Sequence, residues 1–346
     1  MTRSLTAAFA VLLAVLLAGT PARTPAAAQR TDGLRIDTLA PGVTHARAVR
    51  PAGPWVVHVV RVDLRRPDLA LRHVRAHDQL GSRERVSAMA ARRTDAGDLV
   101  LAAVNADFFD LQSGASENNL VLDGEWWKGI RVTESPFDTY DNVHAQFALD
   151  VARRPHIGRF AFDGWVHTRQ ASFPILALNA PSAGAYEGTA LFTPRFGPVT
   201  PRDTMRATSE LALAPAGQRA DTLLYVRRSH ARGGGGAIPR DGVVLAAYGA
   251  RAAALDSTAD GDTLRLTLGV TPWPAPGGAS APLLVIGGWP RILRDGVNIA
   301  ARASAEEGTI SRNAEVRHPR TAVGFRATAP RCCSSRWTAG RPRASA

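Results

Sequence analysis

Short apolar runs separated by tight turns fill most of this chain, and they constrain its fold more than any other feature. The run WVVHVVRVDL, Trp55 to Leu64, is rich in β-branched residues and predicts a buried strand, with LALRHV, Leu69 to Val74, as its hairpin partner. Asp-Gly pairs, which favour hairpin turns, begin at Asp123, Asp163, Asp241 and Asp295. The pattern predicts a sheet built mainly from short strands.

One segment changes to a helical period. Val86, Met89 and Ala90 stand at positions i, i+3 and i+4, and Gly97 is placed to end the helix. Leu99 to Val104 then predicts a short buried strand. Together these elements favour an α+β fold, with a mixed or antiparallel β-rich sheet and a few packed helices. No boundary divides residues 33–325, so we expect one domain there.

The N-terminal residues predict export. Arg3 precedes an apolar run from Ala7 to Ala18, and three alanines, Ala26 to Ala28, precede Gln29, which is typical of a cleaved signal peptide over residues 1–28. No later segment approaches the roughly 20 apolar residues of a membrane helix. We therefore expect a periplasmic or extracellular protein without a membrane span.

Charge and cysteine content exclude two further classes of protein. The formal net charge is +12, but arginines of the signal and of the C-terminal tail supply much of it, and no basic stripe is interleaved with aromatic residues. A nucleic-acid partner is therefore not expected. The two cysteines, Cys332 and Cys333, are adjacent and badly placed to bridge one another, which excludes a disulfide scaffold.

The segment AAVNADFFDLQSGASENN is the first candidate site. It places Asn105, Asp107 and Asp110 after the predicted strand, and Glu117 follows across a loop. Polar groups at strand ends are a common place for binding and catalysis. The alternative is that Asn105 and Asp110 only tie the turn through side-chain to backbone hydrogen bonds.

Two other segments are candidates of the same kind. In APLLVIGGWPRILRDGVNI a buried strand runs into Gly287 and Gly288, which permit close approach of a ligand or form only a bulge. In RHPRTAVGF, Arg320 and Thr321 stand at the start of an apolar strand. An arginine there can grip phosphate or carboxylate, or it can belong to a solvated surface loop.

Other catalytic templates are missing from the sequence. It contains no HExxH or paired-cysteine spacing, no Gly-x-Ser-x-Gly elbow and no dinucleotide-binding fingerprint. We therefore expect no metal ion and no cofactor.

The three candidate segments, in this order, resemble the phosphodiester glycosidase family. The resemblance runs from roughly Trp55 to Phe325 and includes LFTPRFG and IPRDGVVLAAYG. It implies hydrolysis of a sugar joined through its anomeric carbon to a phosphodiester, so a carboxylate and a group that holds the departing phosphate are needed. The departing phosphate needs little protonation, so an arginine can take over much of the work of a general acid.

The resemblance also implies roles for individual residues and a glycan or sugar-phosphate as the partner. The implied catalytic residues are Asp107, Glu117 and Arg320. The implied substrate-binding residues are Asn105, Asn179, Gly287, Gly288 and Thr321. The sequence departs from the family pattern at Ala106 and Trp289, where glycine is usual, and Trp289 there offers a stacking wall for a sugar.

The tail departs further from that pattern. The family continues with a strand, a helix and a strand carrying Leu-Asp-Gly-Gly-Gly-Ser, whereas this sequence loses its apolar pattern at Arg326. Read two bases later, the codons of Cys332-Cys333 must give Leu and those of Trp337-Thr338 must give Asp, which permits Val-Leu-Leu-Val-Thr-Val-Asp-Gly-Arg-Gln. We therefore predict a frameshift, a non-native tail over residues 326–346 and an incomplete, inactive domain. Reading the DNA of the locus in all three frames tests this.

Two other functions remain open at this stage. The scaffold fits an envelope protein that binds glycans without cutting them, or a metal-dependent phosphodiesterase, since a shared fold does not prove a shared activity. Release of free sugar, binding without turnover, and chelator-sensitive cleavage of the phosphate ester distinguish the three.

Overall fold

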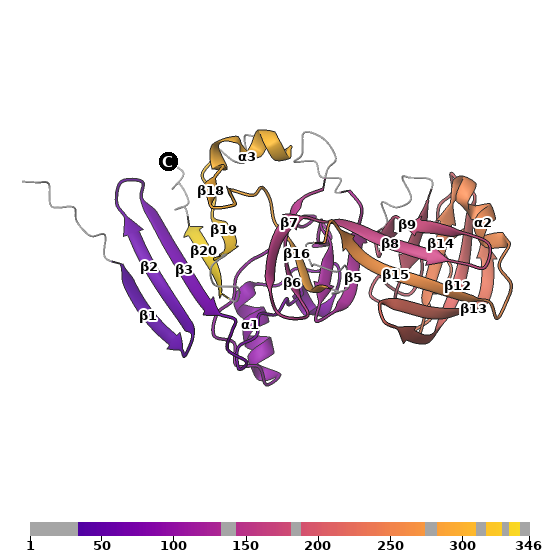
Figure 1. Cartoon of the computed structure of the whole chain (residues 1–346), viewed down its shortest axis with the longest axis horizontal. Helices are drawn as coiled ribbons and strands as arrows, with labels where there is room; N and C mark the ends of the chain where they lie inside the picture. The colour runs from indigo at the N-terminus through magenta and orange to yellow at the C-terminus, as the bar shows by residue number, and fades with distance from the viewer. Residues whose placement is uncertain are drawn as a thin grey trace, which may run out of the picture.

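The computed structural model describes residues 34–132, 143–180, 188–273, 282–308 and 316–326, and the backbone of the strand Cys332–Ala339. The predicted signal peptide lies outside these residues. Two sheets and a small hairpin account for the strands of the described part (Figure 1).

The smaller sheet joins strands from the two ends of the described chain, and all its neighbouring strands are antiparallel. In sheet order the strands are β1 (Arg35–Ala40), β2 (Val43–Arg50), β3 (Trp55–Asp63), β20 (Cys332–Ala339) and β19 (Arg320–Phe325). β19 therefore reaches the rest of this sheet only through β20. The non-native character predicted for residues 326–346 stays a prediction beside this backbone arrangement.

The larger sheet is antiparallel except for one parallel pair, β10 and β11. In sheet order its strands are β7 (Pro155–Arg159), β6 (Ala145–Asp150), β16 (Pro282–Gly287), β4 (Leu120–Leu122), β5 (Glu125–Ile130), β10 (Ala177–Leu178), β11 (Thr189–Phe192), β14 (Val243–Tyr248), β12 (Thr208–Arg219), β13 (Thr222–Arg232), β15 (Thr263–Thr271), β8 (Ala161–His167) and β9 (Ser172–Ile175). β17 (Leu293–Arg294) and β18 (Val297–Asn298) form a separate hairpin around Asp295-Gly296.

The second half of the larger sheet curls around the main hydrophobic core. Leu176 N donates to Thr189 O over 2.8 Å, which brings the end of β9 back beside β11. Inside lie side chains such as Phe162, Leu211 and Leu264, each 0% exposed. Figure 1 shows this curled half at one end of the molecule, the smaller sheet at the other, and β6 and β16 between them.

A second apolar layer joins the two sheets. Val62 and Phe325 of the smaller sheet pack against Phe147 and Leu284 of β6 and β16. Full burial of such a side chain contributes roughly 1.5–3 kcal/mol, and the partly buried Val62 and Phe325 contribute less. The layer packs the smaller sheet against the strands that carry the candidate site.

The predicted α+β class is wrong, because the described chain is nearly all β. It contains three α-helices, α1 (Val86–Asp95), α2 (Ala252–Asp256) and α3 (Ala300–Glu307), beside the strands of the two sheets. The helical pattern at Val86 was read correctly, but α1 buries none of its residues and so forms no packed layer. None of the helices in the described residues is both long and apolar enough to cross a bilayer.

Individual strand predictions had mixed outcomes. Trp55–Asp63 is a strand, as the β-branched run predicts, but its partners are β2 and β20, and Leu69 to Val74 forms no strand. Leu99 to Val104 is not a strand either, and Leu99 is 81% exposed. Asp163 and Gly164 lie inside β8 and not in a turn, because both pair with β15.

Candidate active site

Sheet order places four strand ends at one edge of the larger sheet. β16 runs antiparallel to both β4 and β6, and β5 runs antiparallel to β4. The carboxyl ends of β16 and β5 therefore meet the amino ends of β4 and β6. Gly287, Lys128 and the residues just before Leu120 and Ala145 gather at this edge.

Asp107 is the centre of this edge. Its Oδ1 accepts hydrogen bonds from Phe108 N over 2.7 Å and from Asn118 Nδ2 over 2.6 Å. Its Oδ2 accepts a short hydrogen bond from Ser116 Oγ. Asp107 adopts φ 66°, a left-handed conformation that aspartate tolerates better than most residues and that turns its carboxylate inward. Held on three donors, the carboxylate is fixed in place.

The carboxylate is desolvated although the residue keeps part of its surface exposed. Burial raises the pKa of Asp107 above its ordinary value, while the hydrogen bonds from Ser116 and Asn118 and the charge of Lys128 oppose the rise. A carboxylate with a raised pKa at a strand end is a candidate general base or nucleophile.

Two cations stand beside Asp107. Lys128 Nζ donates to Ser116 O; burial lowers the pKa of Lys128, and the charges of Asp107 and Glu117 oppose this. Arg75 donates through Nη2 to Leu80 O and Gly114 O over 2.7 and 3.0 Å. Burial lowers the pKa of Arg75, and the charge of Asp107 opposes this.

Gly287 is required by the packing at this site. A Cβ at position 287 would overlap Asp107 Oδ1 and Asn118 Nδ2 and lie 2.7 Å from Asn118 Cβ. At Gly288 the nearest atom to an added Cβ is Ala145 O, at 3.9 Å. The first glycine of the pair allows the strand end to pass close to the carboxylate, while the second is not under this constraint.

An aromatic group borders the carboxylate. Asn118 Oδ1 lies 3.0 Å from His144 Nδ1, and the His144 ring stacks on Trp289 at 4.6 Å between centroids. Phe108, which is 40% exposed, meets Trp289 edge to face at 6.1 Å. Trp289 Nε1 donates to Glu307 O over 3.1 Å, so α3 helps to hold the indole.

Some of the predicted site residues lie together at this edge, and others do not. Asp107 and Gly287 are in contact, Gly288 follows directly, and Glu117 is half-buried in the same loop, where its charge acts on Lys128. Asn105 is exposed in the segment before Asp107. Asp110 ties the turn, as the alternative interpretation predicted: its Oδ1 accepts hydrogen bonds from Gln112 N and from Ser113 N and Oγ.

The other predicted residues lie on different elements. Arg320 and Thr321 are exposed at the start of β19 in the smaller sheet, and Arg320 Nη2 donates to Val316 O over 2.9 Å. Asn179 is 1% exposed after β10, where it bonds Trp127 O, Thr193 Oγ1 and Thr193 N, each over 2.8 Å. The side chain of Asn179 therefore links β5 to the segment after β11 through hydrogen bonds.

Sequence reasoning missed most partners of Asp107. Ser116 and Asn118 lie in the same segment as Asp107, whereas Lys128, Arg75 and His144, which bonds Asn118, come from other parts of the chain. Strand register brings Lys128 of β5 and the residue before β6 to this site. One signal was present, because Lys128 is the sole lysine in the sequence.

A second polar cluster resembles a nucleophilic triad but lacks its geometry. Ser209 Oγ lies 2.7 Å from His230 Nε2, and Asp256 Oδ1 lies 3.1 Å from the same nitrogen. A triad needs the hydroxyl and the carboxylate on opposite ring nitrogens. Ser209 is also 1% exposed, so this cluster ties β12 to β13 and α2.

No family model and no curated protein matches this chain. Among solved structures it is similar to a candidate exported protein from Burkholderia pseudomallei K96243, with a TM-score of 0.57 and 19% sequence identity. The match covers 84% of this chain and 62% of that protein, so this chain spans less than two thirds of its length. At this identity the likeness concerns the fold alone.

Proposed function

We propose that this chain carries the active site of an exported hydrolase that cleaves the C1–O bond of a sugar phosphodiester, as phosphodiester glycosidases do. The observation that supports it is the Asp107 carboxylate, held on three donors, desolvated and placed beside Lys128 and Arg75. Such a carboxylate serves as base or nucleophile at an anomeric carbon.

The remaining roles follow the same chemistry. Glu117 is the second carboxylate, and Lys128 keeps Asp107 available in its ionised form. In this proposal Arg320 and Thr321 of β19 receive the departing phosphate. Because that phosphate is bonded directly to C1, the role requires their side chains to reach the sugar held at Asp107. Trp289 and Phe108 offer an aromatic wall to the sugar ring.

Hydrolysis of a synthetic sugar-1-phosphodiester in water labelled with heavy oxygen tests the proposal. Cleavage of the C1–O bond places the label on the sugar, whereas cleavage of the phosphate ester places it on phosphate, and mass spectrometry distinguishes the two. Because the chain as written is predicted to be incomplete and inactive, the assay uses the protein with its reading frame restored beyond Arg326. We expect labelled sugar from that protein, and Asp107→Asn in it should slow the release by about 10³-fold or more.

Controls make the outcome specific. Gly269→Ala, in β15, should remain active, since a Cβ there meets nothing closer than 3.7 Å. Arg320→Ala tests the phosphate-holding role separately: loss of leaving-group stabilisation should lower kcat, whereas a raised KM alone would indicate only substrate binding. Labelled phosphate would favour a phosphodiesterase, and saturable glycan binding without turnover would favour a binding protein on the same scaffold.

Export is the second part of the proposal. It is supported by the signal-like residues 1–28 and by the fold shared with a candidate exported protein. Expression of the full sequence in a bacterial host and N-terminal sequencing of the secreted product should give Gln29 as the first residue. Retention of the uncleaved chain in the cytoplasm would contradict it.

A further inference from the structure

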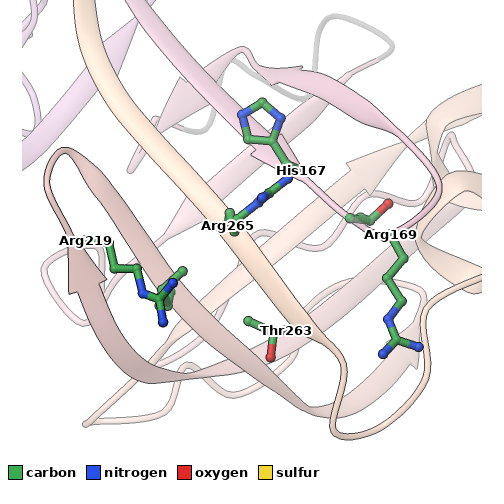
Figure 2. Close-up of a pocket in the computed structure, with 7 residues that line it drawn as sticks. His167, Arg169, Arg219, Thr263 and Arg265 are labelled. Atoms are coloured by element: carbon green, nitrogen blue, oxygen red, sulfur yellow. The ribbon is translucent and has the colours of Figure 1, made fainter.

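A shallow groove crosses the outer face of the curled half of the larger sheet, on different strands from those that carry Asp107. Its volume is about 450 Å³, and Figure 2 shows its lining. The lining residues are His167, Thr168, Arg169, Arg219, Leu224, Thr263 and Arg265. None of them is acidic.

Strand register builds this groove. Leu224 of β13 pairs with Arg265 of β15, and Arg265 pairs with His167 of β8. The neighbours of Arg265 and His167 in sequence, such as Leu264 and Val166, are 0% exposed in the core. Because side chains alternate along a strand, Arg265 and His167 must face outward. Figure 2 shows Arg219 and Arg169 on opposite sides of β15.

The arginines of the groove differ from those of the neighbouring strand β13. Arg227 and Arg228 of β13 pair with Asp260 and Asp241. Within the described part of the chain, no ion pair is made by Arg169, Arg219 or Arg265. Cations gathered on one face of a sheet destabilise it unless an anion compensates them.

Other polar side chains complete the lining. His167 Nδ1 lies 2.7 Å from Ser172 Oγ, which fixes the ring and leaves Nε2 for the groove. Thr168 Oγ1 accepts from Ala171 N over 3.0 Å and so rigidifies the turn that presents Arg169. The hydroxyl of Thr263 lies between these groups at the surface.

We propose that this groove binds the phosphate groups of an extended phosphorylated glycan. Guanidinium groups bind phosphate oxygens bidentately, and several of them are available here without a competing carboxylate. From β12 to β8 the groove crosses three strand spacings, about 14 Å, which suits a chain bearing more than one phosphate. No Phe, Tyr or Trp side chain lines the groove, so nucleic-acid bases would have only the His167 ring to stack on.

Phosphate binding by this groove does not rest on the proposed hydrolysis, whereas the choice of a glycan as the phosphate-bearing chain rests on the proposed substrate class. It would hold equally for a protein that only binds glycans, because its residues and elements are separate from those around Asp107.

Calorimetric titration of the full chain with two probes tests the proposal: inorganic tripolyphosphate and a phosphodiester-linked oligosaccharide. We expect both to bind saturably, and Arg219→Ser and Arg265→Ser each to weaken binding by about tenfold. Both arginines are exposed, so the thermal unfolding midpoint of each variant should stay unchanged. Arg50→Ser, an exposed arginine at the end of β2, removes the same charge elsewhere and should leave binding unchanged.

Four outcomes would overturn the proposal. These are no saturable binding of either probe, an equal loss in Arg50→Ser, tighter binding of single-stranded oligothymidylate than of the oligosaccharide, and equal binding of the same oligosaccharide without its phosphates. The third would assign the groove to nucleic acid, and the fourth would assign it to neutral sugar.

Discussion

At Gly287 the backbone passes so close to Asp107 and Asn118 that no side chain fits. Gly287→Ala should therefore lower the free energy of unfolding by about 2 kcal/mol and remove most hydrolysis, because the new methyl group displaces the carboxylate or the strand end. Gly288→Ala, one residue further, should change the free energy of unfolding by less than about 0.5 kcal/mol. Urea unfolding followed by fluorescence measures both. Equal effects at the two positions would contradict the packing described here.

Lys128 permits a direct measurement of charge at the site. Burial lowers its pKa and Asp107 opposes that, so Asp107→Asn should lower the pKa of Lys128 further. Because the chain has one lysine, labelling at Cε gives a single lysine signal in an NMR titration. Asp37→Asn, on the exposed strand β1, serves as the control and should leave the titration unchanged. If Asp107→Asn left the pKa of Lys128 unchanged, the two charges would not interact as described.

The candidate site could be predicted only in part at the residue scale. Asp107 and Gly287 were selected because a polar residue or a glycine pair after an apolar run has local meaning in the sequence. Asn118 and His144 carry no such local signal, since their roles depend on which strand end lies opposite. Asn179 shows the converse: it was predicted to bind substrate, but its side chain is buried and hydrogen-bonds Trp127 and Thr193.

At the scale of elements, Asn179, which directly follows β10, links Trp127 of β5 to Thr193 just after β11. Asn179→Ala should lower the free energy of unfolding by about 3 kcal/mol, because it loses hydrogen bonds to Trp127 and Thr193 and places alanine at φ 51°. Asn179→Gly keeps that φ accessible and isolates the hydrogen-bond loss. The exposed Asn105→Ala should leave the free energy of unfolding unchanged. If Asn179→Ala altered only KM, its bracing role would be wrong.

Element predictions succeeded where the sequence pattern agreed with strand pairing, although β3, predicted as a buried strand, is only half-buried. β3 and the β4–β5 hairpin around Asp123-Gly124 follow their apolar runs and turn. Leu99 to Val104 failed although its pattern is as apolar, because no strand of the described chain pairs with it. Asp163-Gly164 failed because two flanking strands pair with β8 and override the local turn preference.

At the scale of the whole molecule, His73 should make the global stability depend on pH. Burial lowers the pKa of His73 to about 3, and the charge of Arg75 adds to this. The unfolded chain binds the proton near pH 6.5 whereas the folded chain does not, so stability is complete above that pH and is lost as the pH falls toward 3. Between pH 7 and pH 5 we expect a loss of about 2 kcal/mol from this group.

Comparison of variants isolates this contribution. His73→Gln should flatten the fall in urea-derived unfolding free energy between pH 7 and pH 5, whatever its effect at pH 7. His318→Gln, at an exposed histidine, should keep the slope of the parent protein. Asp107 acts in the opposite direction, since its raised pKa favours the folded state as the pH falls. An unchanged slope in His73→Gln would show that its ring is hydrated.

The order of strands in the smaller sheet sets a constraint on how the molecule folds. β3 begins at Trp55, yet its partner β20 begins at Cys332, and β19 is attached only through β20. A contact between segments this distant in sequence forms slowly, because a long loop must close first. During synthesis and export, β3 therefore keeps an open hydrogen-bonding edge until the last strands emerge, and an open edge is a site for aggregation. For this protein the edge of β3 therefore stays open to aggregation until β20 pairs with it.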